Sequence, residues 1–376
     1  WELTAKEEGG KAQDALKITQ QVAPAVPVTV QQATFTRVDG KYEVGVSPPA
    51  GALPGKGGLE ISLSPKLAVP PPGLRRFFEE YPFSCLEQKT SIAVGLNDAR
   101  RWQAVADSLP GMLDSNGLAG YFPGTPGSAT LTAYLLDLTT LAGFAVPEES
   151  RRRMVQGLTA YAEGRLRTGE WAPASYGDPL LLRRLNALQA LGRQGVQLPR
   201  TVAALEVDPL RLPTAALIDW YLVLQRTADL PQRSKRLAEA QQELRNRLSY
   251  TGGRLTFTTE REDYWWWMML NADANAFRLI EAMLDNPAWQ ADLPRLVQGA
   301  MERQVRGRWL TTTANAWARV TLDRFARKFE REPVAGKTVA SLAKASAEVD
   351  WRQAGAALPR RHIGFDDPLA LLRQAD

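Results

Sequence analysis

The residues best suited to chemistry are the single cysteine, Cys85, and Gln88, which follows it three residues later in the stretch EEYPFSCLEQKTS. Residues three apart lie on one face of a helix, with Cβ atoms roughly 5–6 Å apart. A sulfur in that position has two reactions open to it. It acts as an ordinary thiolate nucleophile, or it attacks the glutamine amide, releases ammonia and closes an internal thioester. Only the second reaction requires this spacing.

The residues around this pair predict the start of a helix. Ser84 and Glu87 have the spacing of a capping box, in which the serine hydroxyl accepts from the Glu87 amide and the glutamate reaches back to the Ser84 amide. Pro82 also fits a chain that enters a helix. We therefore expect Ser84 to be the N-cap, Cys85 the first helical residue and Gln88 the fourth. The positive end of such a helix favours a thiolate.

A thiol-dependent hydrolase would also need a histidine as its base. The chain has one histidine, His362, in the charged stretch PRRHIGFDD, and we interpret it as a solvated surface residue. One cysteine and one histidine provide neither an internal disulfide nor a structural zinc site built from these residue types. We expect no cofactor and no metal.

The overall charge does not indicate a nucleic-acid partner. The 376 residues carry a formal net charge of +5, but the arginines are scattered beside acids in helix-like patterns, so we interpret them as solvated helix faces. The chain begins at Trp1 without a charged and then apolar leader, and it contains no apolar run long enough to cross a bilayer. We interpret it as a piece of a longer protein.

The chain divides into parts that differ in composition and in hydrophobic periodicity. Residues 22–72 are rich in proline, glycine, valine and threonine, and Tyr42 to Val46 and Leu59 to Leu63 alternate with period two, as in strands. Asp39-Gly40 is a hairpin turn signal. From Gly73 to Arg331 the periodicity is helical, so we expect this segment to be all-α.

Similar helical stretches recur at irregular spacing within that segment, with a small residue followed by leucine or aromatic residues on one stripe. They begin at Thr132, Asn186, Thr214, Asn275 and Asn315. Largely apolar helices that alternate with more polar ones suit an inner ring surrounded by an outer ring. The expected fold is therefore mainly α, an α/α toroid inserted in a small β-rich domain that resumes after Arg331.

The stretch YPFSCLEQKTS resembles the thioester motif of the α2-macroglobulin and complement family, whose bacterial branch commonly reads Tyr-Pro-Tyr-Gly-Cys-Leu-Glu-Gln. Phe83 and Ser84 depart from that pattern. PGKGGLEISLSP upstream, and GLAGYFPGTPGSATLTAYLLDL and RWLTTTANAWARVTLDRF downstream, extend the similarity over most of the chain. The resemblance implies a CUB-like part over 1–72, an α/α-toroid thioester domain over 73–331, and returning CUB-like strands with a tail over 332–376.

By this resemblance Cys85 and Gln88 are the two ends of the thioester, and Glu87 is the supporting acid of the motif. The implied function is that of a broad-spectrum protease trap, used once and therefore not an enzyme, whose partners are target proteases and the rest of the macroglobulin chain. After bait cleavage a protease lysine is captured on the Gln88 acyl group. The implied location is the periplasm, in some relatives as an inner-membrane lipoprotein.

In complement-type relatives a histidine of the thioester domain assists transfer to hydroxyl groups. No histidine lies between Gln88 and Arg331 in this chain. A neutral amine attacks a thioester unaided, whereas a sugar hydroxyl needs a base. We therefore expect amines to be preferred.

A thioester needs a dry surround, and DYWWWMMLN from Asp263 to Asn271 is a candidate shield. The residues from Tyr264 to Met269 cannot all face one core stripe, so some must project elsewhere. Ordinary inter-helix packing and contact with a neighbouring domain are the other interpretations.

Two further functions stay open. One is a family member without an active thioester that acts as a docking module, for instance for a penicillin-binding protein of the cell-wall synthesis machinery. The other is an α/α-toroid enzyme such as a glycosidase, which needs two facing carboxylates; Asp178 and Asp263 are an imaginable pair, although nothing in their spacing selects them.

Overall fold

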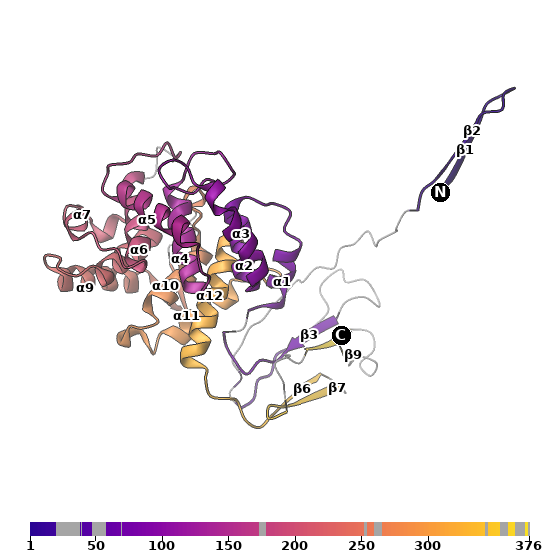
Figure 1. The fold of residues 1–376 in the computed structure, drawn as a ribbon. Helices are drawn as coiled ribbons and strands as arrows, with labels where there is room; N and C mark the ends of the chain where they lie inside the picture. The colour runs from indigo at the N-terminus through magenta and orange to yellow at the C-terminus, as the bar shows by residue number, and fades with distance from the viewer. Residues whose placement is uncertain are drawn as a thin grey trace.

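The computed structural model describes residues 1–19, 38, 40–46, 58–68, 70–172, 178–251, 254–258, 265–342, 345–353, 360–364 and 373–374. Twelve α-helices dominate these residues, accompanied by four small sheets (Figure 1). The prediction of a mainly helical chain is therefore confirmed. No helix in the described part combines the length and the hydropathy needed to cross a bilayer.

Six helices that alternate along the chain pack in a closed circuit, each against the next and the last against the first. They are α2 (Leu86–Leu96), α4 (Ala129–Ala142), α6 (Pro179–Arg193), α8 (Thr214–Arg226), α10 (Ala272–Met283) and α12 (Thr312–Phe329). Nearly every residue of α4 and of α8 is buried. A helix that is apolar all round belongs in the core, so this circuit forms the interior of the helical body.

The other six α-helices are shorter or expose one face, and most of them pack on the outside of the circuit. They are α1 (Pro72–Glu79), α3 (Ala99–Met112), α5 (Glu148–Ala162), α7 (Pro199–Ala203), α9 (Arg233–Asn246) and α11 (Leu293–Glu302). Three 3-10 turns complete the helical elements: η1 (Pro209–Arg211), η2 (Trp266–Met268) and η3 (Pro287–Trp289). All five stretches predicted as helices lie within or overlap circuit helices, so those predictions are confirmed.

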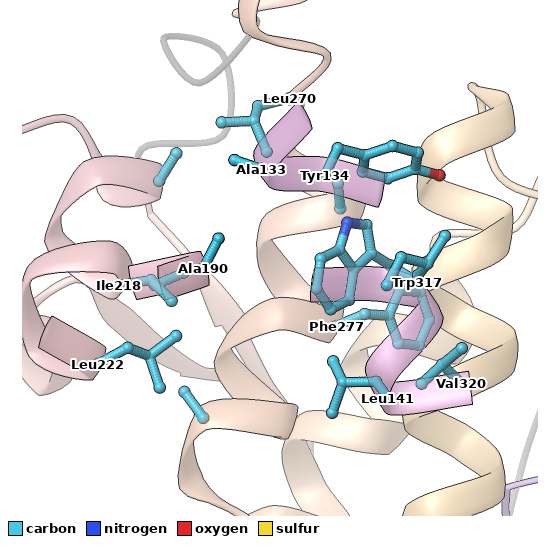
Figure 2. Packing of buried hydrophobic residues seen from close by; sticks show 14 of the residues in the cluster. Ala133, Tyr134, Leu141, Ala190, Ile218, Leu222, Leu270, Phe277, Trp317 and Val320 are labelled. Atoms are coloured by element: carbon cyan, nitrogen blue, oxygen red, sulfur yellow. The ribbon is translucent and has the colours of Figure 1, made fainter. Parts of the chain in front are cut away.

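The apolar core is continuous between α4, α10 and α12. Figure 2 shows Leu141, Phe277, Trp317 and Val320 grouped between these helices. The ring of Phe277 also meets Trp309 edge-on, with centroids 4.7 Å apart. Large side chains of this kind dominate the apolar area that folding removes from water.

Small sheets flank the helices and also interrupt them. β1 (Glu2–Lys6) and β2 (Gln13–Lys17) form a hairpin of their own. β3 (Gly58–Ser62) pairs antiparallel with β8 (Arg360–Gly364), and β8 also pairs with β9 (Arg373–Gln374). β6 (Lys337–Leu342) pairs with β7 (Ala345–Asp350). The strand predicted around Leu59 is thus confirmed as β3. The strand predicted from Tyr42 to Val46 is wrong, because residues 41–46 form none, and Asp39 lies outside the described residues.

The expectation of an uninterrupted α segment is also wrong. A second hairpin, β4 (Leu248–Thr251) with β5 (Arg254–Phe257), lies between α9 and α10. β5 packs closely on α11, where a Cβ on Gly299 would come 2.2 Å from the carbonyl oxygen of Leu255. Strands of four residues are too short to show a clear alternating pattern, and here packing on α11 stabilises them.

The beginning and the end of the helical body meet. Glu330, directly after α12, accepts hydrogen bonds from the amides of Leu67 and Ala68 at 2.6 and 3.3 Å. At the start of α1, a Cβ on Gly73 would come 2.6 Å from the carbonyl oxygen of Arg306. The strand before the helices and the strand after them, β3 and β8, are hydrogen-bonded partners. The chain therefore enters and leaves the helical body at one place.

Charged side chains cross the interior of the circuit. Arg193 of α6 pairs with Asp137 of α4 and lies 3.7 Å from Glu281 of α10, which also accepts from Arg324 of α12 at 2.8 Å. A further buried pair joins α8 to α10: burial raises the pKa of Asp219 to about 6, although the Arg278 cation opposes the rise. Buried charges are tolerated only when they are paired, so these contacts fix how the circuit helices face one another.

Replacing Arg193 by methionine leaves the carboxylate of Asp137 buried without its closest cation. We expect the free energy of unfolding to fall by about 3–5 kcal/mol, the range for removing one partner of a buried pair. Urea unfolding followed by circular dichroism measures the change. Arg152→Met is the matched control, because its pair with Glu149 is largely exposed, and it should leave the transition unchanged. Equal transitions for both variants would contradict a structural role for the buried pair.

Candidate functional site

The first turn of α2 brings Cys85 and Gln88 together. Cys85 is the N-cap, with extended backbone angles (φ −68°, ψ 168°), and Gln88 is the third helical residue. The Cys85 side chain faces the backbone N–H of Gln88, and the Gln88 side-chain oxygen Oε1 accepts from the backbone N–H of Cys85 at 3.0 Å. The two residues predicted from spacing are thus the reciprocal partners of a capping box.

The predicted capping box between Ser84 and Glu87 is therefore wrong by one residue, and the helix begins at Leu86. Two tertiary contacts explain the difference. The Leu86 amide donates to the carbonyl oxygen of Tyr121 at 2.9 Å, which fixes the chain just after Cys85. The Glu87 carboxyl is turned into the core and does not reach back to the helix start. Cys-x-x-Gln has the same spacing as Ser-x-x-Glu, so the sequence did contain the signal for the correct box.

This arrangement favours attack on the acyl carbon of Gln88. When a nucleophile adds to that carbon, negative charge develops on Oε1, the atom that the Cys85 N–H already contacts. The amides at the start of α2 also give this end of the helix a partial positive charge. A donor placed beforehand on a developing oxyanion stabilises the transition state. Cys85 is 8% exposed and Gln88 is half-buried, so one side of the pair is accessible.

The environment of Cys85 does not favour a free thiolate. Burial raises the pKa of the Cys85 thiol, and the Gln88 backbone N–H opposes this rise. Catalytic cysteines have lowered pKa values. The raised pKa therefore gives no support to the alternative of an ordinary thiolate nucleophile, and the acyl alternative rests on the contact between Oε1 and the Cys85 N–H.

Aromatic side chains border the pair on the α1 side. The rings of Phe77, Tyr81 and Phe83 follow one another edge to face, with centroids 5.2 and 5.8 Å apart. Burial raises the pKa of Tyr81, the Glu87 carboxyl raises it further, and a hydrogen bond with the Gln88 side chain opposes the rise. Phe83 is 63% exposed. The site therefore lies where a buried helix start meets an exposed aromatic rim.

The side chains of the tryptophan-rich segment do not all face the core, as expected. Trp265, Trp267 and Met268 are buried, whereas Trp266 is 56% exposed and stacks on Trp171 with ring centroids 5.3 Å apart. Tyr264 and Asp263 lie outside the described residues. The carbonyl oxygen of Met269 accepts from Thr313 at 3.0 Å, so the segment packs on the first turn of α12. Its role as a shield for Cys85 stays a prediction.

Glu87 has partners that sequence reasoning missed. Its Oε1 accepts from Ser91 at 2.6 Å and from Thr312 of α12 at 2.8 Å, and the Ser91 hydroxyl also lies 2.6 Å from the hydroxyl of Tyr134 on α4. The spacing of four between Glu87 and Ser91 was the one available signal. Thr312 and Tyr134 come from distant segments that only the fold brings together.

His362 and Asp178, two further residues considered for chemistry, belong to other elements of the fold. His362 belongs to β8, where its backbone is opposite Glu60 of β3. Asp178 caps α6 by accepting from the amides of Leu180 and Leu181 at 3.0 and 3.1 Å. Asp178 therefore has the role of a helix cap. Across the described residues, no group of three or more histidine, cysteine or acidic side chains is placed to hold a metal ion.

Comparisons with known proteins were made on sequence and on structure. No family model matches the chain, and no curated protein matches its sequence. Solved structures do match its fold. Native α2-macroglobulin from Escherichia coli, from domain MG7 to the C-terminus, aligns with a TM-score of 0.54 and 17% identity, covering 84% of this chain and 53% of that one.

Two structures of Salmonella α2-macroglobulin match similarly. A point mutant aligns with a TM-score of 0.53 and 17% identity, and the protein reacted with methylamine aligns with 0.50 and 19%. They cover 84% and 81% of this chain, which spans 22% of each of theirs. The chain thus spans about half of the E. coli fragment and a smaller share of the longer proteins. It has the fold of the C-terminal region of bacterial α2-macroglobulins.

Proposed function

We propose that this chain is the thioester region of a bacterial α2-macroglobulin-like protease trap, with Cys85 and Gln88 as the two ends of an internal thioester. The observation that carries this proposal is the reciprocal capping box, which holds the sulfur and the side-chain acyl group of these residues in one helical turn. The fold match supports it. In this proposal the closed circuit of helices is the α/α toroid, and the flanking strands belong to a CUB-like domain.

The thioester forms when the Cys85 sulfur adds to the side-chain carbonyl carbon of Gln88. The carbon–nitrogen bond of the amide breaks, and the nitrogen leaves as ammonia with the thiol proton. A primary amine later attacks the same carbon, the carbon–sulfur bond breaks, and the proton lost by the amine restores the thiol. Both steps place negative charge on Oε1, opposite the Cys85 N–H.

In this proposal each thioester acts once, because capture of a lysine consumes the bond and leaves the acyl group of Gln88 attached to the protease. The protein is then an inhibitor that is consumed, and not an enzyme. We propose target proteases as its partners, captured through lysine, together with the rest of a macroglobulin chain. A periplasmic location, with or without a lipid anchor, is part of the same proposal; a cysteine held in a thioester would be protected from oxidation in that compartment.

The amine preference follows from the residues near the site. No histidine lies between Gln88 and Arg331, and the titratable side chains that surround Cys85 are Tyr81, Glu87, Tyr121 and Tyr134. Burial raises the pKa of Tyr121 and Tyr134, so both hydroxyls stay protonated near neutral pH, and Oε1 of Glu87 already accepts from the hydroxyls of Ser91 and Thr312. None of them is suited to deprotonate a weakly nucleophilic hydroxyl.

Intact-mass analysis of freshly purified protein tests the bond directly. We expect the mass to be lower than the encoded mass by one ammonia, because formation of the thioester expels the Gln88 nitrogen. Added methylamine should form a methylamide, whose mass exceeds the encoded mass by one CH2 group, and expose one thiol that iodoacetamide alkylates. Cys85→Ala, which has no sulfur, should retain its encoded mass throughout.

A full encoded mass, with Cys85 alkylated at once, would overturn the proposal in favour of a docking module without a thioester. Conversion of Gln88 to glutamate would instead identify a thioester that hydrolysed during preparation. Peptide mapping of residues 79–91 separates these two results.

The preference for amines is measured by competition. We expect methylamine to form an adduct while glycerol at the same concentration forms none, because a neutral amine needs no base and a hydroxyl does. The methylamide should form faster as the pH rises, since more of the amine is neutral. A glycerol ester formed at a comparable rate would show that a base other than histidine serves this site.

The Cys85 thiol that methylamine releases should have a raised pKa. Burial raises the pKa of Cys85 in the structure, so after methylamine treatment the iodoacetamide rate should reach its midpoint above pH ~8.5, the ordinary cysteine value. The same protein in urea supplies the control, because unfolding removes the burial and should return the midpoint to that value. A midpoint below the value in urea would indicate an activated thiolate instead.

A further inference from the structure

The carboxyl of Glu87 joins three helices through one oxygen. Oε1 accepts from Ser91 on α2 at 2.6 Å and from Thr312 on α12 at 2.8 Å, and the Ser91 hydroxyl lies 2.6 Å from the hydroxyl of Tyr134 on α4. Glu87 is in the first turn of α2 and Thr312 in the first turn of α12. This contact therefore lies where the last helix of the circuit packs against the first.

The surroundings of Glu87 do not suit a negative charge. The side chain is buried, and in the described part of the chain no lysine, arginine or histidine forms an ion pair with it. The titratable groups around it are Cys85, Tyr81, Tyr121 and Tyr134, and each becomes negative when it loses its proton. An isolated buried carboxylate is costly, and such a group stays protonated instead.

We propose that Glu87 is a positioning residue that works in its uncharged form, as an acceptor that pins the first turn of α2 to Thr312 of α12 and, through Ser91, to Tyr134 of α4. Its consequence for acyl transfer rests on the proposed thioester function; its consequence for the exposure of Cys85 does not. Thr312 is the second positioning residue.

The hydrogen-bond pattern explains why an uncharged group is sufficient. Ser91 and Thr312 both donate to Oε1, so the contacts require one carbonyl-type oxygen and leave the other oxygen available for the proton. A glutamine side chain offers the same carbonyl oxygen with the same reach. An acid or base acting on the reacting atoms has a different requirement, because it must exchange a proton and glutamine does not.

α12 offers a matched pair of threonines for the test. Thr312 and Thr313 are adjacent, both are buried, and each hydroxyl donates one hydrogen bond. Only Thr312 contacts Glu87, whereas Thr313 donates to the carbonyl oxygen of Met269. Valine at either position removes one hydroxyl and retains the branched shape.

The experiment compares Glu87→Gln, Glu87→Ala, Thr312→Val, Thr312→Ser and Thr313→Val with the unmodified chain. Two rates are measured on each: hydrolysis of the thioester in buffer, and alkylation of the Cys85 thiol by iodoacetamide after methylamine treatment. We expect Thr312→Val to raise both rates roughly tenfold, the change that one lost hydrogen bond corresponds to, and Glu87→Ala, which loses two, to raise them at least as much. Glu87→Gln, Thr312→Ser and Thr313→Val should stay near the unmodified rates.

The outcomes separate a positioning role of Glu87 from proton exchange and from a general effect on stability. If Glu87→Gln raises both rates as much as Glu87→Ala, a carbonyl-type oxygen is not sufficient at this position and the proposal is overturned. Equal effects of Thr312→Val and Thr313→Val would reduce the contact to general stability of α12. If the unmodified chain never forms a thioester, the proposed function fails while the alkylation rates of Cys85 still test the positioning role.

Discussion

The structure depends on how the first turn of α2 satisfies its own backbone. The amides at a helix start lack partners within the helix, and here Cys85 and Gln88 supply partners for each other. The contacts that begin the helix are thus the same contacts that hold the sulfur beside the acyl group. The proposed thioester would keep the carbonyl oxygen of Gln88, so the Cys85 N–H would retain its acceptor and the helix its cap. The proposed reaction and the fold thus use one set of atoms.

The rest of the helical body holds this turn in place. The Leu86 amide is bound by the Tyr121 carbonyl, and Glu87 is bound by Thr312, so the residues just after Cys85 are fixed from two directions. Farther along the circuit helices, the ion pairs between Arg193, Asp137 and Glu281 fix the orientation of α4, α6 and α10 relative to one another. Apolar packing makes the interior compact, and the polar contacts determine which faces meet.

Much of this was predictable because it is local. The recurring apolar stripes predicted five of the six circuit helices, and the spacing of three predicted that Cys85 and Gln88 meet. The N-cap was misplaced at Ser84 because two capping boxes overlap in the sequence, and contacts from Tyr121 and Thr312 decide between them. The hairpin of β4 and β5 was missed because its short strands depend on packing against α11. The ion pairs join helices far apart in the sequence, and periodicity does not identify such partners.

The chain enters and leaves the helical body at one place, where Glu330 holds the amides of Leu67 and Ala68 and where β3 pairs with β8. The helices next to that place, α1 and α12, are also the neighbours of α2. The connection between the flanking strands and the turn that holds Cys85 and Gln88 therefore passes through one helix, either α1 or α12.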